Sequence, residues 1–221
     1  MKTFKKIFTV FTLIITLFSQ DNNYFNFEED KMGWAPHYDP ADHMQITNVI
    51  WNNNPSYTFL GNGSIEVQFD DMVAVENKPN DRGHAEVALS NFAPYNFPPG
   101  QPYYNLSNET LQIRFLVPAA HWDPNIEVYL VLKSTNDNWT WYRDYGPFNA
   151  GTGVTADVWY ETNITLGVTP YNFSDATFNM SRVYRMGIKI SAQSAGGVDA
   201  GSVYLDSWHW GGDNAPPFIS N

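Results

Sequence analysis

Three stretches in which apolar and polar residues alternate decide the fold of this chain. Residues 111–117 read LQIRFLV, residues 127–134 read EVYLVLKS, and residues 183–191 read VYRMGIKIS. An alternation with a period of two is typical of β-strands, because successive side chains point to opposite faces of a sheet. In each stretch one alternate set is apolar and predicts a core face. The other set carries most of the polar residues and predicts an outer face.

Further strands are predicted on both sides of these three stretches. Residues 64–69 (SIEVQF) alternate after the turn-like Gly-Asn-Gly at 61–63, and residues 202–205 begin a last strand. Clusters of Asn, Gly, Pro and Asp separate the runs, and no helical period of 3.6 persists. Many short strands at roughly even spacing are typical of sandwiches. We therefore predict an all-β, jelly-roll β-sandwich, a single domain spanning residues 21–213.

The two ends of the chain are predicted to lie outside this domain. Residues 1–19 begin with lysines and continue with the apolar run IFTVFTLIITLF at 7–18. A run of about 12 residues is too short to span a bilayer and is typical of a cleaved secretory signal peptide. The alternative is an uncleaved membrane anchor. Residues 214–221 contain a Pro-Pro pair and are predicted to form a C-terminal tail.

The charge and the cysteine content narrow the possible partners. The chain has 221 residues with 12 Lys and Arg against 23 Asp and Glu, a formal net charge of −11, and no cysteine. Such a surface repels nucleic acid and anionic membranes and disfavours acidic glycans. A secreted domain of this size does not need disulfides, because its core is large enough to hold the fold.

The chain is rich in acceptor sites for N-linked glycans. An Asn-x-Ser/Thr triplet without proline is the acceptor sequence, and a leader ahead of such triplets favours a eukaryotic secretory route. The predicted glycosylation sites are Asn62, Asn105, Asn108, Asn138, Asn163, Asn172 and Asn179. We therefore predict a secreted, extracellular glycoprotein.

The order of several short motifs resembles a known family type. Phe27-Glu28 followed by Gly33-Trp34 resembles the opening of carbohydrate-binding modules with a galactose-binding-like jelly roll. Further motifs in matching order are residues 61–64 (GNGS), Val117-Pro118, residues 128–134 followed by 138–142 (NWTWY), Trp159, and residues 186–190 followed by 203–206 (VYLD). The resemblance covers nearly the whole mature chain.

This resemblance implies a function and a set of partners. It is nearest to the modules that bind mannan or β-glucan and are attached to bacterial and fungal glycanases. We therefore expect a lectin-like protein that binds a neutral polysaccharide and is not an enzyme. A secreted glycanase or self-assembly is a further possible partnership. Such modules usually accompany a catalytic domain, whereas we expect this one to act alone or with partners that it meets after secretion.

Candidate sugar-binding residues lie on the predicted outer faces. Trp139 and Trp141 are two apart, so they share a face if they lie in a strand, and indole rings stack on the C–H faces of sugars. The alternative is that both rings pack in the core. If their strands form one sheet, polar side chains beside the rings can donate to sugar hydroxyls. These candidates are Arg143, Arg114, Lys133, Gln112 and Tyr129.

The resemblance also implies a structural metal ion. In the resembled modules a calcium ion joins the first and last strands, held by acidic side chains and backbone carbonyls. Glu28 and Asp206 occupy the matching positions. Asp206 follows an apolar run, where an unpaired buried carboxylate is costly and a Ca²⁺ ion would offset that cost. The alternatives are a salt bridge or an exposed carboxylate.

Two other functional classes remain open from the sequence. An acidic, glycosylated domain can be the structural subunit of an extracellular coat or fibre, joined through exposed aromatic residues and edge strands. A jelly-roll polysaccharide lyase or hydrolase is the third class. The chain contains no E-x-D-x-x-E arrangement and no H-E-x-x-H motif, so it offers no recognised pair of catalytic carboxylates or zinc site.

Overall fold

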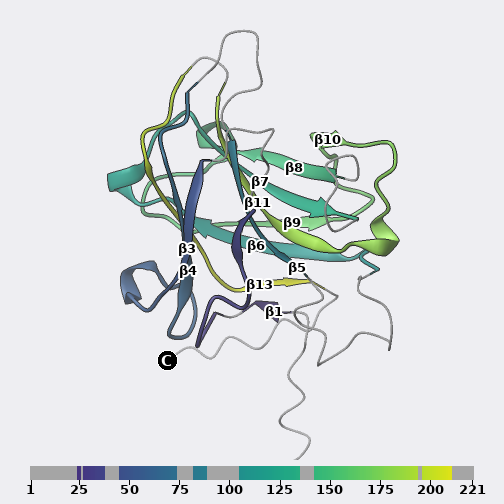
Figure 1. Ribbon diagram of the computed structural model, residues 1–221, viewed down its shortest axis with the longest axis horizontal. Coiled ribbons are helices and arrows are strands. Elements are labelled where there is room, and N and C mark those ends of the chain that lie inside the picture. The colour runs from purple at the N-terminus through teal and green to yellow at the C-terminus, as the bar shows by residue number, and fades with distance from the viewer. Residues whose placement is uncertain are drawn as a thin grey trace, which may run out of the picture.

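The strands of this protein form two layers, as the computed structural model shows (Figure 1). It describes residues 24–25, 27–37, 45–73, 82–88, 105–134, 142–193 and 196–210. The strands in these ranges are β1 (Tyr24–Phe25), β2 (Ala35–His37), β3 (Ile46–Asn52), β4 (Ser64–Phe69), β5 (Arg82–Ala88), β6 (Thr110–Leu116), β7 (Ile126–Lys133), β8 (Tyr142–Phe148), β9 (Tyr160–Thr165), β10 (Phe173–Ser174), β11 (Arg185–Ala192), β12 (Gly201–Leu205) and β13 (Trp208–Trp210).

Helical structure in the described ranges is limited to short 3-10 turns. They are η2 (Pro55–Tyr57), η4 (Ala119–His121), η6 (Ala150–Thr152) and η7 (Met180–Arg182). None of the helices in these ranges is long and apolar enough to cross a membrane. The predicted signal peptide at 1–19 and the tail at 214–221 fall outside the described residues, so both stay predictions.

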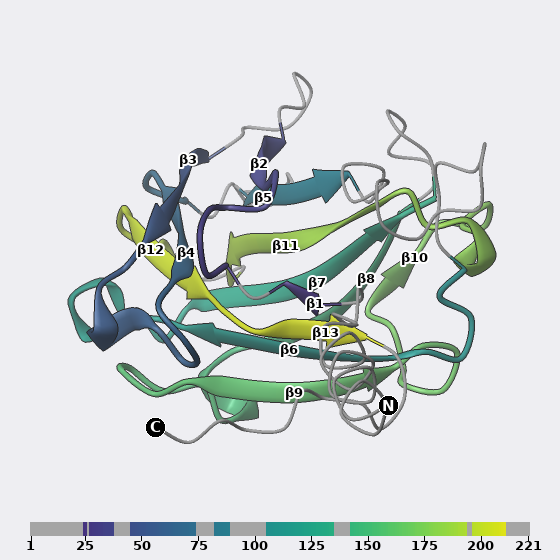
Figure 2. The same cartoon turned by 90° about the horizontal axis from the view of Figure 1, so that it is seen from below.

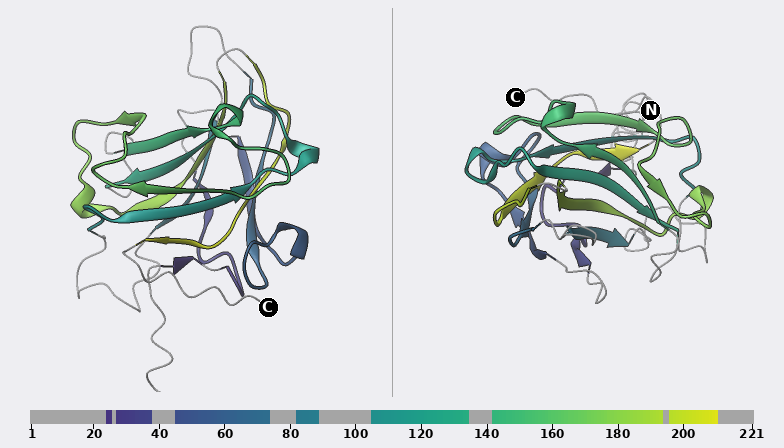
Figure 3. Two further views of the ribbon diagram at one scale, coloured as in Figure 1. Left: turned by 180° about the vertical axis from the view of Figure 1, so that it is seen from behind. Right: turned by 90° about the horizontal axis from the view of Figure 1, so that it is seen from above.

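The strands pair antiparallel in two sheets. The seven-stranded sheet runs β1-β13-β6-β12-β4-β3, with β9 on the other side of β6. The six-stranded sheet runs β10-β8-β7-β11-β5-β2. Figures 2 and 3 show the two layers from further sides. The predicted all-β sandwich is therefore confirmed.

The core lies between the sheets and is formed by the apolar faces that the sequence predicted. Val128, Leu130 and Leu132 from β7 are fully buried, and so are Ile113 and Phe115 from β6. All five belong to one continuous hydrophobic cluster. Burying each side chain of this size contributes about 1.5–3 kcal/mol, so this alternation is the main source of stability in a chain without disulfides.

An aromatic cluster joins the N-terminal segment to the last strand. Trp34 lies edge-on to Phe25, with ring centroids 5.7 Å apart, and edge-on to Trp208, with centroids 5.3 Å apart. Phe25 also contacts Trp210 at 5.3 Å. Edge-to-face pairs of this kind add to the free energy gained by burial. The two ends of the domain are thus held together by packed rings.

Candidate functional site

The outer face of the six-stranded sheet carries a row of residues from five adjacent strands. Strand register places Phe173, Asp144, Val131, Gly187 and Glu86 opposite one another from β10 to β5. Directly opposed residues point to the same face of a sheet, so this row crosses one face. Phe173 at one end is 50% exposed. The row therefore places the exposed ring of Phe173 on the same face of the sheet as the buried carboxylates of Asp144 and Glu86.

Buried polar side chains surround the middle of this row. We call the set the polar floor, and each member is at most 8% exposed. The polar floor consists of His84, Glu86, Tyr129, Lys133, Asp144 and Lys189. Charged groups are costly to bury unless they are paired, so the partners of each member explain how the set is stable.

Glu86 is the centre of the first group of charges. Its side chain crosses Gly187 of β11, where an added Cβ would lie only 2.7 Å from its Cγ. This path brings Glu86 Oε1 to 2.7 Å from Lys133 Nζ and to 3.1 Å from His84 Nδ1. Glu86 Oε2 faces His37 Nδ1 at 3.6 Å. The glycine is thus needed for a salt bridge between β5 and β7 across the strand between them.

The protonation states in this group follow from burial and pairing. Burial alone would raise the pKa of Glu86, but the hydrogen bond with His84 and the charge of Lys133 lower it to about 2. Burial lowers the pKa of His84 to about 4, despite the opposing effect of Glu86. At neutral pH Glu86 is therefore a carboxylate, and His84 is a neutral imidazole that donates its Nδ1–H to it.

Lys189 and Asp144 form the second group. Lys189 Nζ donates to Asp144 Oδ2 and lies 3.7 Å from the ring centroid of Tyr129. Burial lowers the pKa of Lys189, whereas Asp144 opposes the shift. Asp144 Oδ1 accepts hydrogen bonds from Asn172 Nδ2 and from the backbone N–H of Phe173, both at 3.0 Å. Asp144 therefore holds in place the edge strand β10, which carries Phe173.

The predicted sugar-binding residues divide between three places. Tyr129 and Lys133 lie on the polar floor, although both are buried rather than exposed as the alternation suggested. Arg143 pairs with the core residue Leu132 in the register of β7 and β8, so it belongs to the opposite face. The expectation that Arg143 lies beside Lys133 is therefore wrong. Trp139 and Trp141 fall outside the described residues, and their role stays a prediction.

Arg143 contacts two aromatic rings near the edge of the six-stranded sheet. Its guanidinium carbon lies 4.5 Å from the ring centroid of Tyr171 and 4.6 Å from that of Phe178. Its Nε also donates to Ser174 Oγ at 2.9 Å. Cation–π contacts of this kind stabilise a ring in one position. Arg143 thus helps to hold Tyr171, which is 52% exposed.

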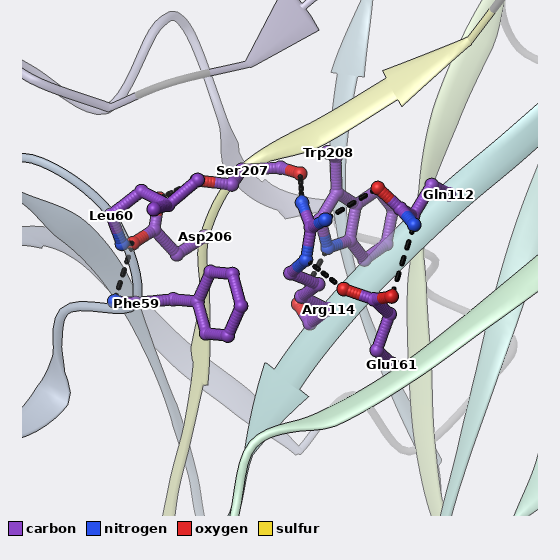
Figure 4. A network of polar contacts seen from close by, with 8 residues as sticks. All are labelled: Phe59, Leu60, Gln112, Arg114, Glu161, Asp206, Ser207 and Trp208. Carbon is purple, nitrogen blue, oxygen red and sulfur yellow. Dashed lines mark hydrogen bonds and ion pairs between the residues drawn. The ribbon is translucent and has the colours of Figure 1, made fainter. Parts of the chain in front are cut away.

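Gln112 and Arg114 lie on the other sheet, so the expected common surface of all the polar candidates is wrong. Both belong to β6 of the seven-stranded sheet. Figure 4 shows Arg114 Nε donating to Glu161, its NH2 group donating to Gln112, and its NH1 group donating to the carbonyl oxygen of Ser207 at 2.6 Å. Arg114 is 3% exposed. Its donors therefore hold β6, β9 and the turn before β13 together.

The same network anchors a loop through Asp206. The backbone N–H groups of Phe59 and Leu60 donate to Asp206 Oδ2 at 2.7 and 3.0 Å, and Ser207 Oγ donates to Oδ1 at 2.9 Å (Figure 4). The guanidinium carbon of Arg114 also lies 4.7 Å from the ring centroid of Phe59. Residues predicted to bind sugar and metal thus meet in one structural network.

The two predicted calcium ligands anchor the same loop. Glu28 Oε2 accepts hydrogen bonds from the backbone N–H and the side-chain amide of Asn62 at 2.8 and 3.1 Å. Burial raises the pKa of Asp206 to about 6, and the nearby charge of Glu28 acts in the same direction. A cation beside Asp206 would favour its charged form, and Ca²⁺ takes about six to eight oxygen ligands, so the two carboxylates would supply only part of such a site. In the described ranges no group of three or more His, Cys, Asp or Glu side chains has metal-binding geometry.

The predicted glycosylation sites that the structure describes are all at the surface. The side chains of six of the seven asparagines are exposed: Asn62, Asn105, Asn108, Asn163, Asn172 and Asn179. Asn138 falls outside the described residues. Exposure is the condition that a bulky glycan requires, and occupancy stays a prediction.

The sequence analysis did not select four members of the polar floor as site residues: His84, Glu86, Asp144 and Lys189. His84 and Glu86 alternate in the stretch RGHAEVA of β5, which gave a weak signal for a polar outer face. Phe173 lies in a strand of two residues, too short for any periodic signal. Only the pairing of distant strands brings these residues together.

Comparison with known proteins agrees with this architecture. No protein-family profile and no curated relative matches the sequence. A structure of carbohydrate-binding modules from the β-sandwich superfamily matches with a TM-score of 0.50 and 16% identity, over 87% of this chain and 63% of that chain. The chain shares its fold with these modules. At this identity the likeness concerns the fold alone.

Two weaker matches are to xylan-binding proteins. The xylan-binding domain from Paenibacillus barcinonensis has a TM-score of 0.47 and 9% identity, with 86% of this chain and 92% of that chain covered. A xylan-binding module has a TM-score of 0.46 and 12% identity, with 80% and 89% covered. The expected preference for mannan or β-glucan stays a prediction.

Proposed function

We propose that this chain binds a neutral polysaccharide, of the mannan or β-glucan type, on the outer face of its six-stranded sheet and does not cleave it. The observation that carries the proposal is the polar floor in line with the exposed ring of Phe173. A sugar presents hydroxyl groups, which donate and accept hydrogen bonds, and C–H faces, which stack on aromatic rings. A fixed polar surface beside an exposed ring offers both kinds of contact.

The charge balance of the polar floor supports an uncharged ligand. Lys133 is paired with Glu86, and Lys189 is paired with Asp144. Because both ammonium groups already have a carboxylate partner, neither offers an unbalanced positive charge to a uronic acid. The net charge of −11 for the whole chain acts in the same direction.

An aromatic residue beside the floor supplies a stacking surface. Phe173 is 50% exposed and is paired with Asp144 of the floor, whereas Arg143 holds Tyr171 on the opposite face. Trp139 and Trp141 precede β8 in the sequence and stay candidates for the same role. Large rigid rings provide contact area at a small entropic cost, which suits a ligand that binds along a surface.

The protonation states support binding without catalysis. A general acid or base works best with a pKa near the operating pH, and glycosidases need two such carboxylates across the scissile bond. The pKa of Glu86 is lowered to about 2, and Asp144 accepts hydrogen bonds from Lys189, Asn172 and Phe173. Glu86 is therefore a permanent anion and a poor proton donor at neutral pH, and both carboxylate oxygens of Asp144 already accept hydrogen bonds within the protein.

Affinity electrophoresis on mannan, β-glucan, xylan and an acidic glycan tests the proposal. We expect retardation on a neutral glycan and none on the acidic one. Phe173→Ala keeps the Asn172 acceptor triplet and should weaken retardation. The double variant Trp139→Ala/Trp141→Ala tests the sequence-based candidates. Val158→Ala, another exposed apolar residue at 56% exposure, is the matched control and should bind normally.

The outcome that contradicts sugar binding is a folded protein with no retardation on any glycan. Retardation that Phe173→Ala leaves unchanged, but Trp139→Ala/Trp141→Ala abolishes, would support sugar binding with the stacking surface on the two tryptophans. Release of reducing ends from any of the glycans would contradict the non-catalytic part. The variants therefore distinguish a loss of sugar binding from sugar binding at a different position on the protein.

We also propose that the protein is a secreted glycoprotein with a structural Ca²⁺ ion held by Glu28 and Asp206. The exposure of the described acceptor asparagines supports the first part, and the raised pKa of Asp206 beside Glu28 supports the second. Thermal unfolding with Ca²⁺ and with a chelator tests the ion. We expect Ca²⁺ to raise the Tm of the wild type and to leave that of Asp206→Asn unchanged. An equal Tm in both conditions would contradict Ca²⁺ binding.

A further inference from the structure

The open edges of the two sheets differ in how they resist pairing with another strand. At β3 the register shifts between Ile46 and Asn48, and Lys31 Nζ donates to the carbonyl oxygen of Val49 at 3.2 Å. Strand β2 has only three residues and includes Pro36, and β1 and β10 have two residues each. Bulges, lysines, prolines and short length are the usual means of blunting an edge.

Strand β9 has none of these protections. It pairs with β6 over six consecutive residues without a register shift, from Thr110 opposite Thr165 to Phe115 opposite Tyr160. Figures 2 and 3 show β9 along the border of its sheet, beside β6. Within the described ranges no strand pairs with its other side. Strand β9 is therefore the longest regular edge that the structure describes.

The hydrogen bonds at the end of β9 show which backbone groups face outward. Leu166 donates its backbone N–H to Glu109 on the β6 side, whereas the N–H of Thr165 donates to Thr169 Oγ1 at 2.9 Å. Thr165 is therefore directed away from β6. Since alternate residues of a strand share a direction, the N–H and C=O groups of Asn163 and Glu161 also point toward the open edge.

Asn163 is also an acceptor for an N-linked glycan. Its side chain is exposed and opposes Gln112 on the outer face, and it begins the triplet Asn163-Ile164-Thr165. An added strand would lie about 4.8 Å from β9. A glycan at that position would rise from the outer face directly beside the added strand, and its bulk would crowd the side chain that faces Asn163 there. The residue at the centre of the open edge is thus the one that can carry a steric block.

We propose that an N-linked glycan on Asn163 closes the β9 edge, which without the glycan pairs with the β9 edge of a second copy of this chain. Antiparallel pairing centred on Asn163 places Asn163 opposite itself and Glu161 opposite Thr165 of the second copy. Like charges therefore do not face one another. A two-fold contact of this kind uses the same surface on both copies, so association stops at a dimer. This inference does not depend on sugar binding.

We expect the dimer to be weak. We also expect a glycan on Asn163 to be sufficient to prevent it. The central Asn163 pair would exchange two hydrogen bonds, and each contributes on the order of 1 kcal/mol net. The turn at Thr169 already occupies the N–H of Thr165, which limits the pairing to the middle of the strand. A bulky substituent at the centre therefore removes most of the contact.

Secretion of three variants from a eukaryotic cell line tests this inference. Asn163→Gln removes the acceptor and keeps a neutral amide. Asn163→Lys also removes it but places like charges opposite one another in the dimer. Ser107→Ala removes a different glycan, the one on Asn105, and is the matched control. Mass is measured by sedimentation over a range of concentrations, glycan occupancy by mass spectrometry, and folding by circular dichroism.

We expect the wild type, Asn163→Lys and Ser107→Ala to stay monomeric, and Asn163→Gln to double its mass as concentration rises. Hydrogen exchange at the amides of Glu161 and Asn163 should slow in that dimer. The inference is overturned if folded Asn163→Gln stays monomeric at all concentrations, or if Asn163→Lys also dimerises. It is equally overturned if Asn163→Gln forms open polymers, or if the monomeric wild type carries no glycan on Asn163.

Discussion

The outer faces of the two sheets both contain buried charges, but they use them differently. On the six-stranded sheet, the salt bridge from Glu86 to Lys133 joins side chains within the sheet, as does the one from Lys189 to Asp144. On the seven-stranded sheet, Arg114 and Asp206 bond to backbone atoms of adjoining turns. The first arrangement forms a regular, charge-balanced surface. The second uses its charges to hold loops.

The largest expected effect is on the six-stranded sheet. Glu86→Gln leaves Lys133 buried at 2% exposure without its counter-ion. Removing one partner of a buried salt bridge costs about 3–5 kcal/mol, so the free energy of unfolding should fall by that amount. Urea denaturation measures it. Glu161→Gln is the control, because that carboxylate is 41% exposed and should cost less. Equal losses in the two variants would contradict the difference between the faces.

A smaller effect is expected from Arg114→Lys on the seven-stranded sheet. Lysine keeps the positive charge but cannot reproduce the fork that reaches Glu161, Gln112 and the carbonyl of Ser207 together. Losing hydrogen bonds of a charged group should lower the free energy of unfolding by about 1–3 kcal/mol. Arg182→Lys, at an exposed position in η7, is the control. A variant as stable as the wild type would mean that charge alone holds these turns.

The smallest effect is a difference in pH dependence between the faces. The folded-state pKa of Glu86 is lowered from 4.5 to about 2, so its contribution to stability is present above pH 4.5 and lost as the pH falls through 2. The pKa of Asp206 is raised from 3.8 to about 6. As the pH falls, Asp206 therefore becomes protonated in the folded state at a higher pH than in the unfolded state. The contribution of Asp206 should therefore become more favourable as the pH falls from 7 toward 4.

Denaturation of the wild type and Asp206→Asn in the presence of a chelator measures the Asp206 contribution. The difference in unfolding free energy should move in favour of the wild type as the pH is lowered from 7 to 4. His84 titrates in the same range, with its pKa lowered from 6.5 to about 4, but it is present in both proteins and cancels in the difference. A difference that moves in the opposite direction would contradict the raised pKa of Asp206.

The strands with clear alternation were predictable, namely β4, β6, β7, β11 and β12, whereas the other strands were not and the site was predictable only in part. The alternation in residues 111–117 and 127–134 identified β6 and β7 and their core faces, because a period of two is a local property of the chain. Tyr129 and Lys133 were correctly placed on an outer face. Their burial was not predictable, since it depends on Glu86 and Lys189, which come from other strands.

The wrong expectations have the same origin. The sequence gives no indication that β6 belongs to one sheet and β7 to the other, so Gln112 and Arg114 were expected to lie beside Lys133. Arg143 was expected on the face of Lys133, but strand pairing sets it opposite the core residue Leu132. A displacement of one residue along a strand reverses the face to which a side chain points.

By itself, the sequence determined the all-β class, the positions of β4, β6, β7, β11 and β12, the acidic character and the glycan acceptor triplets, because composition and alternation act over a few neighbouring residues. The tertiary structure alone decided which charges meet on the polar floor, which charges hold turns, and which strand is left as an open edge. Those outcomes depend on pairing between strands that are far apart in the chain. Many residues contribute to the free energy of that pairing, and no pattern in neighbouring residues indicates which strands will pair.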